Sequence, residues 1–496
     1  MIRFSPNTNR AHMIPWVEWS DDAFRVAQEQ NKPVMLYLCA FWCRYCQRMD
    51  EEAFSETENI ALLKAYFVSI RAENAQRPDL DTRYNQNGWP TIVFMTPQGD
   101  PIIATNYLPS DQFEDLLLRV YMSHQQTQTN SSTTAEPEEK THADLGKIAA
   151  PNSAQLDEIT ATILNLADSV NGGYGEGQKF IQPEANDFLL ARYEATKDLN
   201  YLDLARLTLD RMREGAIHDH KEGAYFRTTS GADWSRPHRE KLLNEQAGLL
   251  ANCLRTYRIT RQPVYAGMAQ EIIGYLNRKL YDSATTLFYG CEDFLRTFAG
   301  DSSAPEEFST MIDWCLYTDA NAHTISAYLD ASHLLGNNEY KQIALRAIEA
   351  LWERCRTPGS GMCHYLDDEP RVPGLIADQV QMGSALLMAH AITGEEKHLQ
   401  RAKELAQLIM ARFKNPSGGY FDICASGAAY LRLRLTLIEQ NGPAASFFLA
   451  LANATGAASY RDAALWAFVP FTENFAEYGI HAAAFGRALN DFFQPR

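Results

Sequence analysis

The motif Trp42-Cys43-Arg44-Tyr45-Cys46 carries the residues whose types and spacing most directly predict chemistry. A separation of three positions puts both sulfur atoms on one turn of a helix, within reach of a disulfide bond. Cys43 is expected at the helix N-terminus, where free N–H groups and the helix dipole favour a thiolate. We therefore predict that Cys43 is the nucleophile and that Cys46 is the resolving thiol, which attacks the mixed disulfide.

A second motif, Trp89-Pro90-Thr91, lies downstream of the cysteine pair and begins an apolar run. Cis peptides are a small minority of X–Pro bonds in folded proteins, but this position after a strand–WCxxC–helix unit favours a cis-proline loop packed against the cysteines. The backbone of such a loop would hold an extended peptide. We therefore expect Trp42, Trp89, Pro90 and Thr91 to line a substrate groove.

Two other roles for the cysteine pair remain open. A structural zinc site normally needs four ligands, and the sequence has neither a second CxxC nor a histidine pair at the matching spacing. Two inert structural cysteines are a better alternative than zinc, but the preceding tryptophan and the expected helix start argue against inertness. We accordingly expect no metal and no other cofactor.

The seven remaining cysteines are irregularly spaced and do not form a disulfide framework. We expect them to act as small buried hydrophobic residues. Cys363-His364 is a weak nucleophile pair, because neighbours in sequence rarely point the same way outside a turn.

Helix and strand signals alternate in residues 14–122, around the two motifs. A helix is expected over 19–31, with Ser20 as its N-cap, and a strand over 34–40 that is apolar on both faces. A second helix begins at Cys43. Further strands are expected at 66–71, 91–95 and 101–104, and a last helix at 111–123. This order predicts an α/β domain over residues 1–123.

The composition changes after this domain. Residues 125–139 read QQTQTNSSTTAEPEE, with no aromatic and almost no aliphatic side chain. Such a segment cannot bury enough apolar surface to offset the entropy lost on ordering. We predict a flexible linker at 124–148 and a second domain at 149–496.

The second domain is expected to be almost entirely helical, and its sequence repeats. A Thr is followed five positions later by a residue with a ring, and an Ala follows that residue after four more positions. The copies are Thr196/Tyr201/Ala205, Thr260/Tyr265/Ala269, Thr393/His398/Ala402 and Thr455/Tyr460/Ala464. Tyr340/Ala344 is a copy without the Thr. A period near 60 residues implies two helices per repeat, with a turn between them.

Glycine-aromatic turns join one helical hairpin to the next. They are Gly172-Gly173-Tyr174, Gly223-Ala224-Tyr225 and Gly418-Gly419-Tyr420, with weaker versions at Phe288-Tyr289-Gly290 and Gly361-Met362. The two series of turns together indicate about twelve helices in six hairpins. This number favours a closed all-α toroid, an (α/α)6 barrel, while an open solenoid remains the alternative, because periodicity alone does not establish closure.

Polar residues near these turns would face a common cavity. They are Glu184, His238, Glu240, Asp293, Asp319 and Asp378, with Tyr174, Tyr225 and Trp314 nearby. Rings can stack on sugar faces, and two carboxylates can act as acid and base. We take His238, Glu240, Asp319 and Asp378 as a possible toroid site. The alternative is structural, since a helix N-terminus favours an acidic residue in any case.

Acidic residues outnumber basic ones, with 62 Asp+Glu against 45 Lys+Arg and a net charge of −17. This surplus argues against a nucleic-acid or anionic-membrane partner. The longest strongly apolar run, 34–43, is far shorter than the roughly 20 residues that span a bilayer, and the N-terminus lacks the features of a signal peptide. We expect a cytoplasmic protein with no nucleic-acid and no membrane partner.

The motifs resemble those of one known family. The matching stretches of the first domain are Asn31-Lys32-Pro33, Cys43 to Met49, Glu52-Ala53-Phe54, Arg77-Pro78-Asp79 and Gly88-Trp89-Pro90. Those of the second are Gly172-Gly173-Tyr174 with Lys179-Phe180, Pro237-His238 with Glu240-Lys241-Leu242, Thr318-Asp319 with Asn321, and Ala377-Asp378. They are similar to the spermatogenesis-associated thioredoxin-like family (YyaL-type). The resemblance implies a thioredoxin-like domain joined to a six-hairpin glycosidase-like barrel.

The sequence departs from this family around the cysteine pair. Arg44 and Gln47 stand where the family often carries histidine, and Tyr37 stands where ordinary thioredoxins carry a buried aspartate. The usual proton acceptor for Cys46 is therefore absent.

Three functions fit these observations. The leading one is a thiol–disulfide oxidoreductase that acts on protein thiols or disulfides with a reductant, joined to a toroid that recognises a ligand or partner. The competing one is a carbohydrate-active isomerase or hydrolase with its site in the toroid. The third is a binding protein whose cysteine pair is vestigial.

Overall fold

The structure, a computed structural model, describes residues 2–130, 150–297, 307–357, 359–424, 431 and 433–494. The chain divides into two compact units. The first comprises Met1–His142 with Ala428–Leu433, and the second comprises Ala143–Gly427 with Arg434–Arg496.

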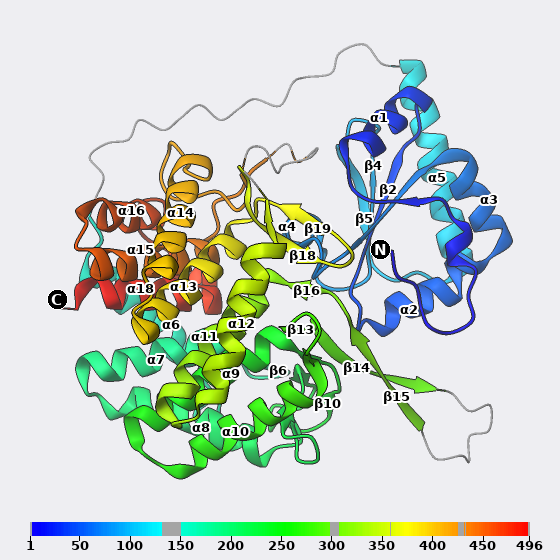
Figure 1. The fold of residues 1–496 in the computed structure, drawn as a ribbon. Coiled ribbons are helices and arrows are strands. Elements are labelled where there is room, and N and C mark those ends of the chain that lie inside the picture. Colours follow the sequence, from blue (N-terminus) through cyan, green and yellow to red (C-terminus); the bar gives the residue numbers. More distant parts are fainter. Residues whose placement is uncertain are drawn as a thin grey trace. The chain divides into compact units, whose positions relative to one another are not determined.

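The first unit contains a five-stranded sheet in the order β1-β3-β2-β4-β5 (Figure 1). Its strands are β1 Trp16–Val17, β2 Val34–Cys39, β3 Val68–Glu73, β4 Thr91–Met95 and β5 Pro101–Thr105. Strands β1, β2 and β3 are parallel, whereas β4 runs antiparallel to β2 and β5. Every residue of β2 is buried, as expected for a strand that is apolar on both faces.

Short helices accompany this sheet. They are η1 Ala11–Met13, α1 Asp21–Gln30, α2 Arg44–Glu51, η2 Ala53–Ser55, α3 Thr57–Tyr66, α4 Pro78–Tyr84 and α5 Ser110–Asn130. Ser20 caps α1 by accepting a hydrogen bond from the Ala23 N–H, as predicted. Helix α5 continues to Asn130, so the first residues of the expected linker at 124–148 are helical. Positions 131–148 of that linker lie outside the described residues.

The second unit is a closed ring of six helical hairpins (Figure 1). The inner helices are α7 Pro183–Thr196, α9 Leu243–Thr260, α11 Thr318–Leu334, α13 Ile376–Thr393, α15 Ile438–Thr455 and α18 Ala483–Phe493. Each inner helix packs against the next, and α18 packs against α7. The predicted closed toroid is therefore confirmed over the open solenoid.

Outer helices return the chain between the inner ones. They are α6 Ser153–Leu166, α8 Leu199–Glu214, α10 Pro263–Tyr275, α12 Asn338–Arg354, α14 Glu396–Arg412 and α16 Ala458–Phe468. A π-helical turn η3 (Leu276–Leu280) follows α10, and α17 Phe475–Tyr478 and η5 Gly479–Ala482 precede α18. Because inner and outer helices alternate, the inner helices all run in the same direction and begin at the same end of the toroid.

Each threonine of the repeat ends an inner helix in the same way. The hydroxyl of Thr196 donates to the carbonyl four residues earlier and accepts the N–H two residues later. Thr260, Thr393 and Thr455 make the same two contacts. The repeat alanines on the following outer helices, Ala205, Ala269, Ala402 and Ala464, are fully buried. The repeat thus marks the tight turn and the close helix packing of four hairpins.

Side-chain amides tie the glycine-aromatic turns to the inner helices. Gln246 accepts from the backbone N–H of Tyr225 at 3.0 Å and donates to its carbonyl at 2.6 Å. Equivalent amide clamps join Asn321 to Phe288, Gln379 to Met362 and Asn441 to Tyr420. Each clamping amide is the fourth residue of its inner helix. These clamps fix the connecting segments against the helix N-termini.

The connecting segments contain strands, which the expectation of an almost entirely helical domain missed. The strands are β6 Lys179–Phe180, β7 His218–Asp219, β8 Ala224–Tyr225, β9 Thr228–Thr229, β10 Pro237–His238, β11 Lys241–Leu242, β12 Tyr281–Asp282, β13 Leu287–Phe288, β14 Cys291–Thr297, β15 Glu307–Asp313, β16 Leu316–Tyr317, β17 Arg356–Thr357, β18 Gly361–Leu366 and β19 Pro370–Pro373. Most are only two residues long, too short for a period-two pattern to stand out in the sequence.

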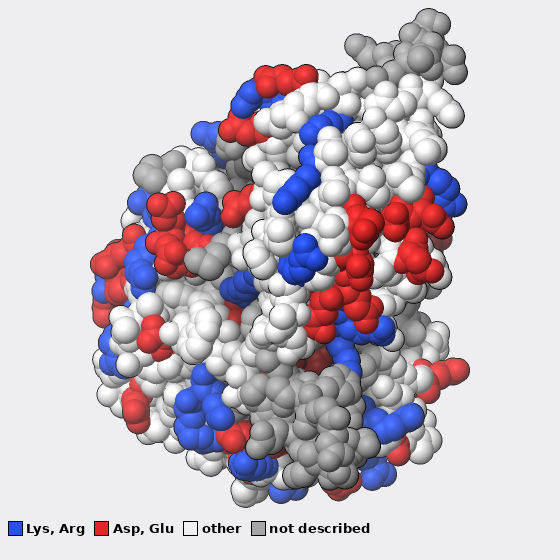
Figure 2. Space-filling view, turned by 90° about the vertical axis from the view of Figure 1, so that its right-hand side faces the viewer, with Lys and Arg blue, Asp and Glu red and all other residues white. Residues whose placement is uncertain are grey.

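Charges of both signs are interspersed on the surface drawn in Figure 2, with acidic side chains gathered more densely than basic ones. This agrees with the acidic composition. Across the part of the chain that the structure describes, none of the helices combines the length and the apolar character that crossing a bilayer requires.

Candidate functional site

The cysteine pair lies where strand β2 passes into helix α2. Cys43 is the N-cap of α2, and its Sγ accepts the Cys46 N–H at 3.2 Å. Both cysteines are buried and neither is in a disulfide. Burial raises the pKa of the Cys46 thiol well above its usual value, and the hydrogen bond with Cys43 raises it further. Cys46 is therefore held as a thiol.

An unusual group of residues lies behind the pair. The Tyr37 hydroxyl donates to the Cys46 carbonyl at 3.1 Å, and its ring is fully buried. The Arg71 guanidinium lies 4.9 Å from the Tyr37 ring centroid and forms two hydrogen bonds to Asp50, at 2.7 and 2.9 Å. Burial raises the pKa of Tyr37 well above its usual value, so the phenol stays protonated. Tyr37 thus anchors the backbone of Cys46.

The predicted proline loop packs against the cysteine motif. The Trp89–Pro90 peptide is cis, as expected. The rings of Trp42 and Trp89 meet edge to face with centroids 5.2 Å apart. Thr91 is fully buried, and its hydroxyl donates to the Gly88 carbonyl at 2.8 Å. Thr91 therefore holds the loop from beneath, whereas the partly exposed Trp42 and Trp89 lie at its surface.

Two further residues fix this loop and were missed at the level of sequence. The Asn106 amide donates to the Pro90 carbonyl at 3.0 Å and to the Gly88 carbonyl at 3.2 Å. The Trp89 indole N–H donates to Asp81 at 2.8 Å. Asn106 follows β5 directly, and Asp81 lies in α4 within eight residues of Trp89. A polar residue just past a neighbouring strand is the signal that could have found Asn106.

Carboxylates gather at one end of the toroid. Five inner helices carry one in the first turn: Glu184, Glu245, Asp319, Asp378 and Glu439. Since the inner helices begin at the same end, these groups share that end. Each also benefits from the positive end of its own helix dipole.

One cluster forms where the segment before α9 meets β14. Glu240 accepts two hydrogen bonds from Arg227, at 2.8 and 3.1 Å. Lys241 pairs with Glu292 across β11 and β14, and continuing this register places Glu240 opposite Asp293. Burial, with a smaller contribution from the Glu240 charge, raises the pKa of Asp293 to about 7. Asp293, which the sequence places near a glycine-aromatic turn, lies in strand β14 and not at the start of an inner helix.

A second cluster joins α11, β18 and α13. His364 Nδ1 lies 3.0 Å from Asp378 Oδ1, and both side chains are buried. Burial raises the pKa of Asp378 to about 7; His364 opposes this shift and the Asp319 charge adds to it. Asp319 and Asp378 were expected together, but His364 was missed, because it lies 45 residues beyond Asp319 in the chain.

His238 joins neither cluster. It is exposed, and its Nε2 lies 3.0 Å from the Ser230 hydroxyl. Trp314, expected near the mouth of the cavity, is 63% exposed and packs against Tyr289. The four predicted toroid residues are therefore divided, with Glu240 in one cluster, Asp319 and Asp378 in the other, and His238 apart.

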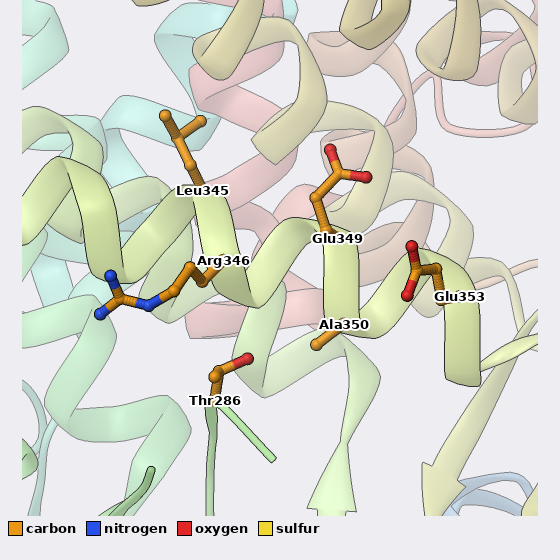
Figure 3. A pocket seen from close by; sticks show the side chains of 6 residues that line it. All are labelled: Thr286, Leu345, Arg346, Glu349, Ala350 and Glu353. Atoms are coloured by element: carbon orange, nitrogen blue, oxygen red, sulfur yellow. The ribbon is translucent and has the colours of Figure 1, made fainter. Parts of the chain in front are cut away.

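A shallow pocket on the outer helix α12 lacks the features of a reaction site. It is lined by Thr286, Leu345, Arg346, Glu349, Ala350 and Glu353 (Figure 3). Glu349 forms ion pairs with Lys397 and Arg401 of α14, at 3.3 and 2.9 Å. Its carboxylate is thus engaged in joining two outer helices.

The first unit is similar to known thioredoxin-like proteins. Residues 7–142 match the family Thioredox_DsbH, described as "Protein of unknown function, DUF255". This N-terminal region is therefore similar to the DsbH thioredoxin-like family. The DsbH-like region is also 37% identical over 97 residues to the thiol:disulfide interchange protein DsbD of Yersinia pestis, an alignment that covers 18% of this chain and 16% of that protein.

The resemblance to the spermatogenesis-associated family is confirmed. The chain is 29% identical over 308 residues to human spermatogenesis-associated protein 20, and the alignment covers 56% of this chain. It covers 39% of the human protein, so the match spans well under half the length of that relative.

Solved structures resemble the toroid that follows the DsbH-like region. Cellobiose 2-epimerase from Spirochaeta thermophila superposes with a TM-score of 0.54 at 14% identity, over 68% of this chain and 95% of that one. At this identity the likeness establishes the fold of the toroid alone.

Proposed function

We propose that the chain is a thiol–disulfide oxidoreductase that uses Cys43 and Cys46, joined to a toroid that binds a ligand or partner. The observation that carries this proposal is the placement of Cys43 at the N-cap of α2 beside the cis-Pro90 loop. The similarity of the first unit to a thiol:disulfide interchange protein supports it.

The reaction follows from the different surroundings of the two sulfur atoms. The Cys43 thiolate attacks one sulfur of a substrate disulfide, which forms a mixed disulfide and releases the first substrate thiolate. Cys46 then loses its proton and attacks Cys43 Sγ, which forms the Cys43–Cys46 disulfide and releases the second thiolate. Two electrons pass to the substrate. A dithiol reductant restores the pair by the reverse exchange.

The proline loop gives this reaction its peptide-binding surface. The Trp42 and Trp89 rings form an apolar wall beside Cys43, and Asn106 holds the loop carbonyls. An extended peptide bound along the loop would bring its disulfide to the sulfur atom of Cys43. The substrate class is accordingly a protein disulfide.

The test is reduction of a protein disulfide, with insulin as the probe. The native chain should reduce it with a dithiol as the electron source, and Cys43→Ser should abolish the activity. Cys46→Ser should accumulate the mixed disulfide, detectable by mass spectrometry. Cys253→Ala, a buried cysteine of α9, is the matched control and should leave the rate unchanged. A pair that forms no disulfide under any glutathione ratio would contradict the proposal.

A second candidate function is supported by the Glu240–Asp293 cluster. Asp293, with its pKa of about 7, holds a proton near neutrality, whereas Glu240 is paired with Arg227. Sugar hydrolysis or isomerisation needs one group that donates a proton and one that accepts it, and a protonated carboxyl beside a second carboxyl group is one way to supply them. Turnover of a carbohydrate that is lost in Asp293→Asn but retained in Cys43→Ser would favour this function.

A further inference from the structure

Three side chains of kinds that commonly bind metals meet in the second unit. One donor atom from each of Asp319, His364 and Asp378 lies within 4.8 Å of the other two. His364 and Asp378 are buried, while Asp319 is only partly buried. The cluster can therefore be reached from the side of Asp319.

The three ligating residues are held by rigid elements. Asp319 is the second residue of α11, Asp378 the third of α13, and His364 lies within β18. Helices α11 and α13 pack against each other and both contact β18. The Gln379 amide bonds the Met362 N–H and carbonyl, at 2.7 and 2.9 Å, and so locks β18 onto α13. Contacts of this kind, behind the ligating side chains, hold those side chains in position before an ion binds.

The repeat provides an independent comparison. In the hairpin of α9, the residue two positions after the amide-clamped Tyr225 is Arg227, a permanent cation that pairs with Glu240. In the hairpin of α13, the equivalent position after the clamped Met362 is His364. The same place in the fold thus holds a fixed positive charge in one hairpin and an imidazole in the other.

The cluster of Asp319, His364 and Asp378 therefore lacks the fixed cation that Arg227 supplies to Glu240. Among the residues that the structure describes, no lysine or arginine forms an ion pair with Asp319 or Asp378. Burying the Asp378 carboxylate near a second carboxylate, with only an imidazole beside it, is costly. A bound divalent cation would neutralise both at once.

We propose that Asp319, His364 and Asp378 bind a divalent first-row transition-metal ion, of the Mn²⁺ or Zn²⁺ class. One nitrogen and two oxygen donors suit these ions, whereas Ca²⁺ and Mg²⁺ prefer oxygen alone. Metal–ligand bonds of about 2.0–2.2 Å place neighbouring donor atoms roughly 3–3.5 Å apart. The donor atoms lie within 4.8 Å of one another, so the partly buried Asp319 carboxylate would turn toward the other two donors on binding.

Three protein ligands leave coordination positions open. Open positions are typical of metal sites that bind a substrate or water, whereas structural sites are closed by four protein ligands. The ion would bind an oxygen-bearing ligand, such as a hydroxyl or carbonyl group, at the end of the toroid where the inner helices begin. This site is independent of the cysteine chemistry.

The test is Mn²⁺ binding to the full chain, followed by electron paramagnetic resonance. A Cys43→Ser/Cys46→Ser background removes the two thiols of the cysteine motif as competing ligands. The chain is first treated with a chelator and dialysed to remove bound metal. We expect the metal-free chain to bind one Mn²⁺ when the ion is added. Asp319→Asn and His364→Gln should each weaken binding by at least about tenfold. His238→Ala, an exposed histidine of the same unit, is the control and should bind as the parent does.

Two results would overturn the proposal. One is that the amplitude of the free-Mn²⁺ signal does not fall when the protein is added, even at millimolar Mn²⁺, and that elemental analysis finds no Zn²⁺ retained by the protein. The other is unchanged affinity in Asp319→Asn, whose partly exposed position makes it the variant least able to disturb the fold. In either case, Asp378 and His364 form only a buried ion pair.

Discussion

The indole rings of Trp42 and Trp89 meet edge to face, with their centroids 5.2 Å apart. Trp42 directly precedes Cys43, and Trp89 directly precedes the cis proline. The contact therefore joins the two motifs, which lie nearly fifty residues apart in the chain. Asp81 fixes the orientation of Trp89 through its indole N–H.

Removal of the Trp89 ring should weaken the binding of protein substrates more than it slows thiol–disulfide exchange at Cys43. In Trp89→Ala, we expect the KM for a protein disulfide to rise by roughly fivefold or more. The lost contacts bind the substrate equally in the ground state and in the transition state, so kcat should change little. The rate with a small aromatic disulfide should stay within about twofold. Steady-state kinetics with both substrates measure the difference. Trp314→Ala, an exposed tryptophan of the toroid, is the control; equal losses on both substrates would contradict the assigned groove.

The buried pair of Arg71 and Asp50 should be critical for the first unit. Both side chains are almost fully buried and share two hydrogen bonds. Asp50→Ala leaves the Arg71 charge without a partner, and we expect a loss of about 3–5 kcal/mol in unfolding free energy. Denaturant unfolding followed by near-ultraviolet circular dichroism measures it. Replacing both residues by apolar ones should recover much of the loss; a double variant as unstable as the single one would refute this explanation.

Stability should depend on pH through Asp293. Its pKa of about 7 in the folded chain exceeds the ordinary value of 3.8. The folded state therefore binds the proton more tightly, and stability falls as pH rises between these two values. Asp293→Asn removes this penalty. The variant should gain up to about 4 kcal/mol above pH 7 and nothing below pH 4.

Thermal unfolding at pH 4, 6 and 8 would reveal this crossover. A difference between Asp293→Asn and the native chain that does not vary with pH would show that the carboxyl group titrates normally.

The amide clamps should contribute strongly to toroid stability. Asn441→Ala leaves the buried N–H and carbonyl of Tyr420 without their side-chain partner. Each unsatisfied buried group costs about 1–3 kcal/mol, so we expect a loss of roughly 2–4 kcal/mol. Calorimetric unfolding measures it. Asn338→Ala, at an exposed position at the start of α12, should change little; comparable losses in both variants would contradict the clamp.

The local signals in the sequence predicted the parts of the fold that rest on nearby residues. The N-cap at Ser20, the helix start after Cys43 and the threonine turns each depend on hydrogen bonds within five residues. The local features depend on residue spacing, so the sequence alone determines them. The repeat of about twelve helices favoured a closed ring, but an open solenoid has the same period, and the packing of α18 against α7 decided between them.

Tertiary structure decided which polar side chains meet. Glu240 faces Asp293 because two short strands pair, and His364 reaches Asp378 because an amide clamps β18 to α13. His238, two residues from Glu240, faces elsewhere. Strand register and side-chain direction arise from contacts between distant segments, which no periodic pattern encodes. The cysteine pair could therefore be predicted from sequence, whereas the clusters of the toroid required the fold.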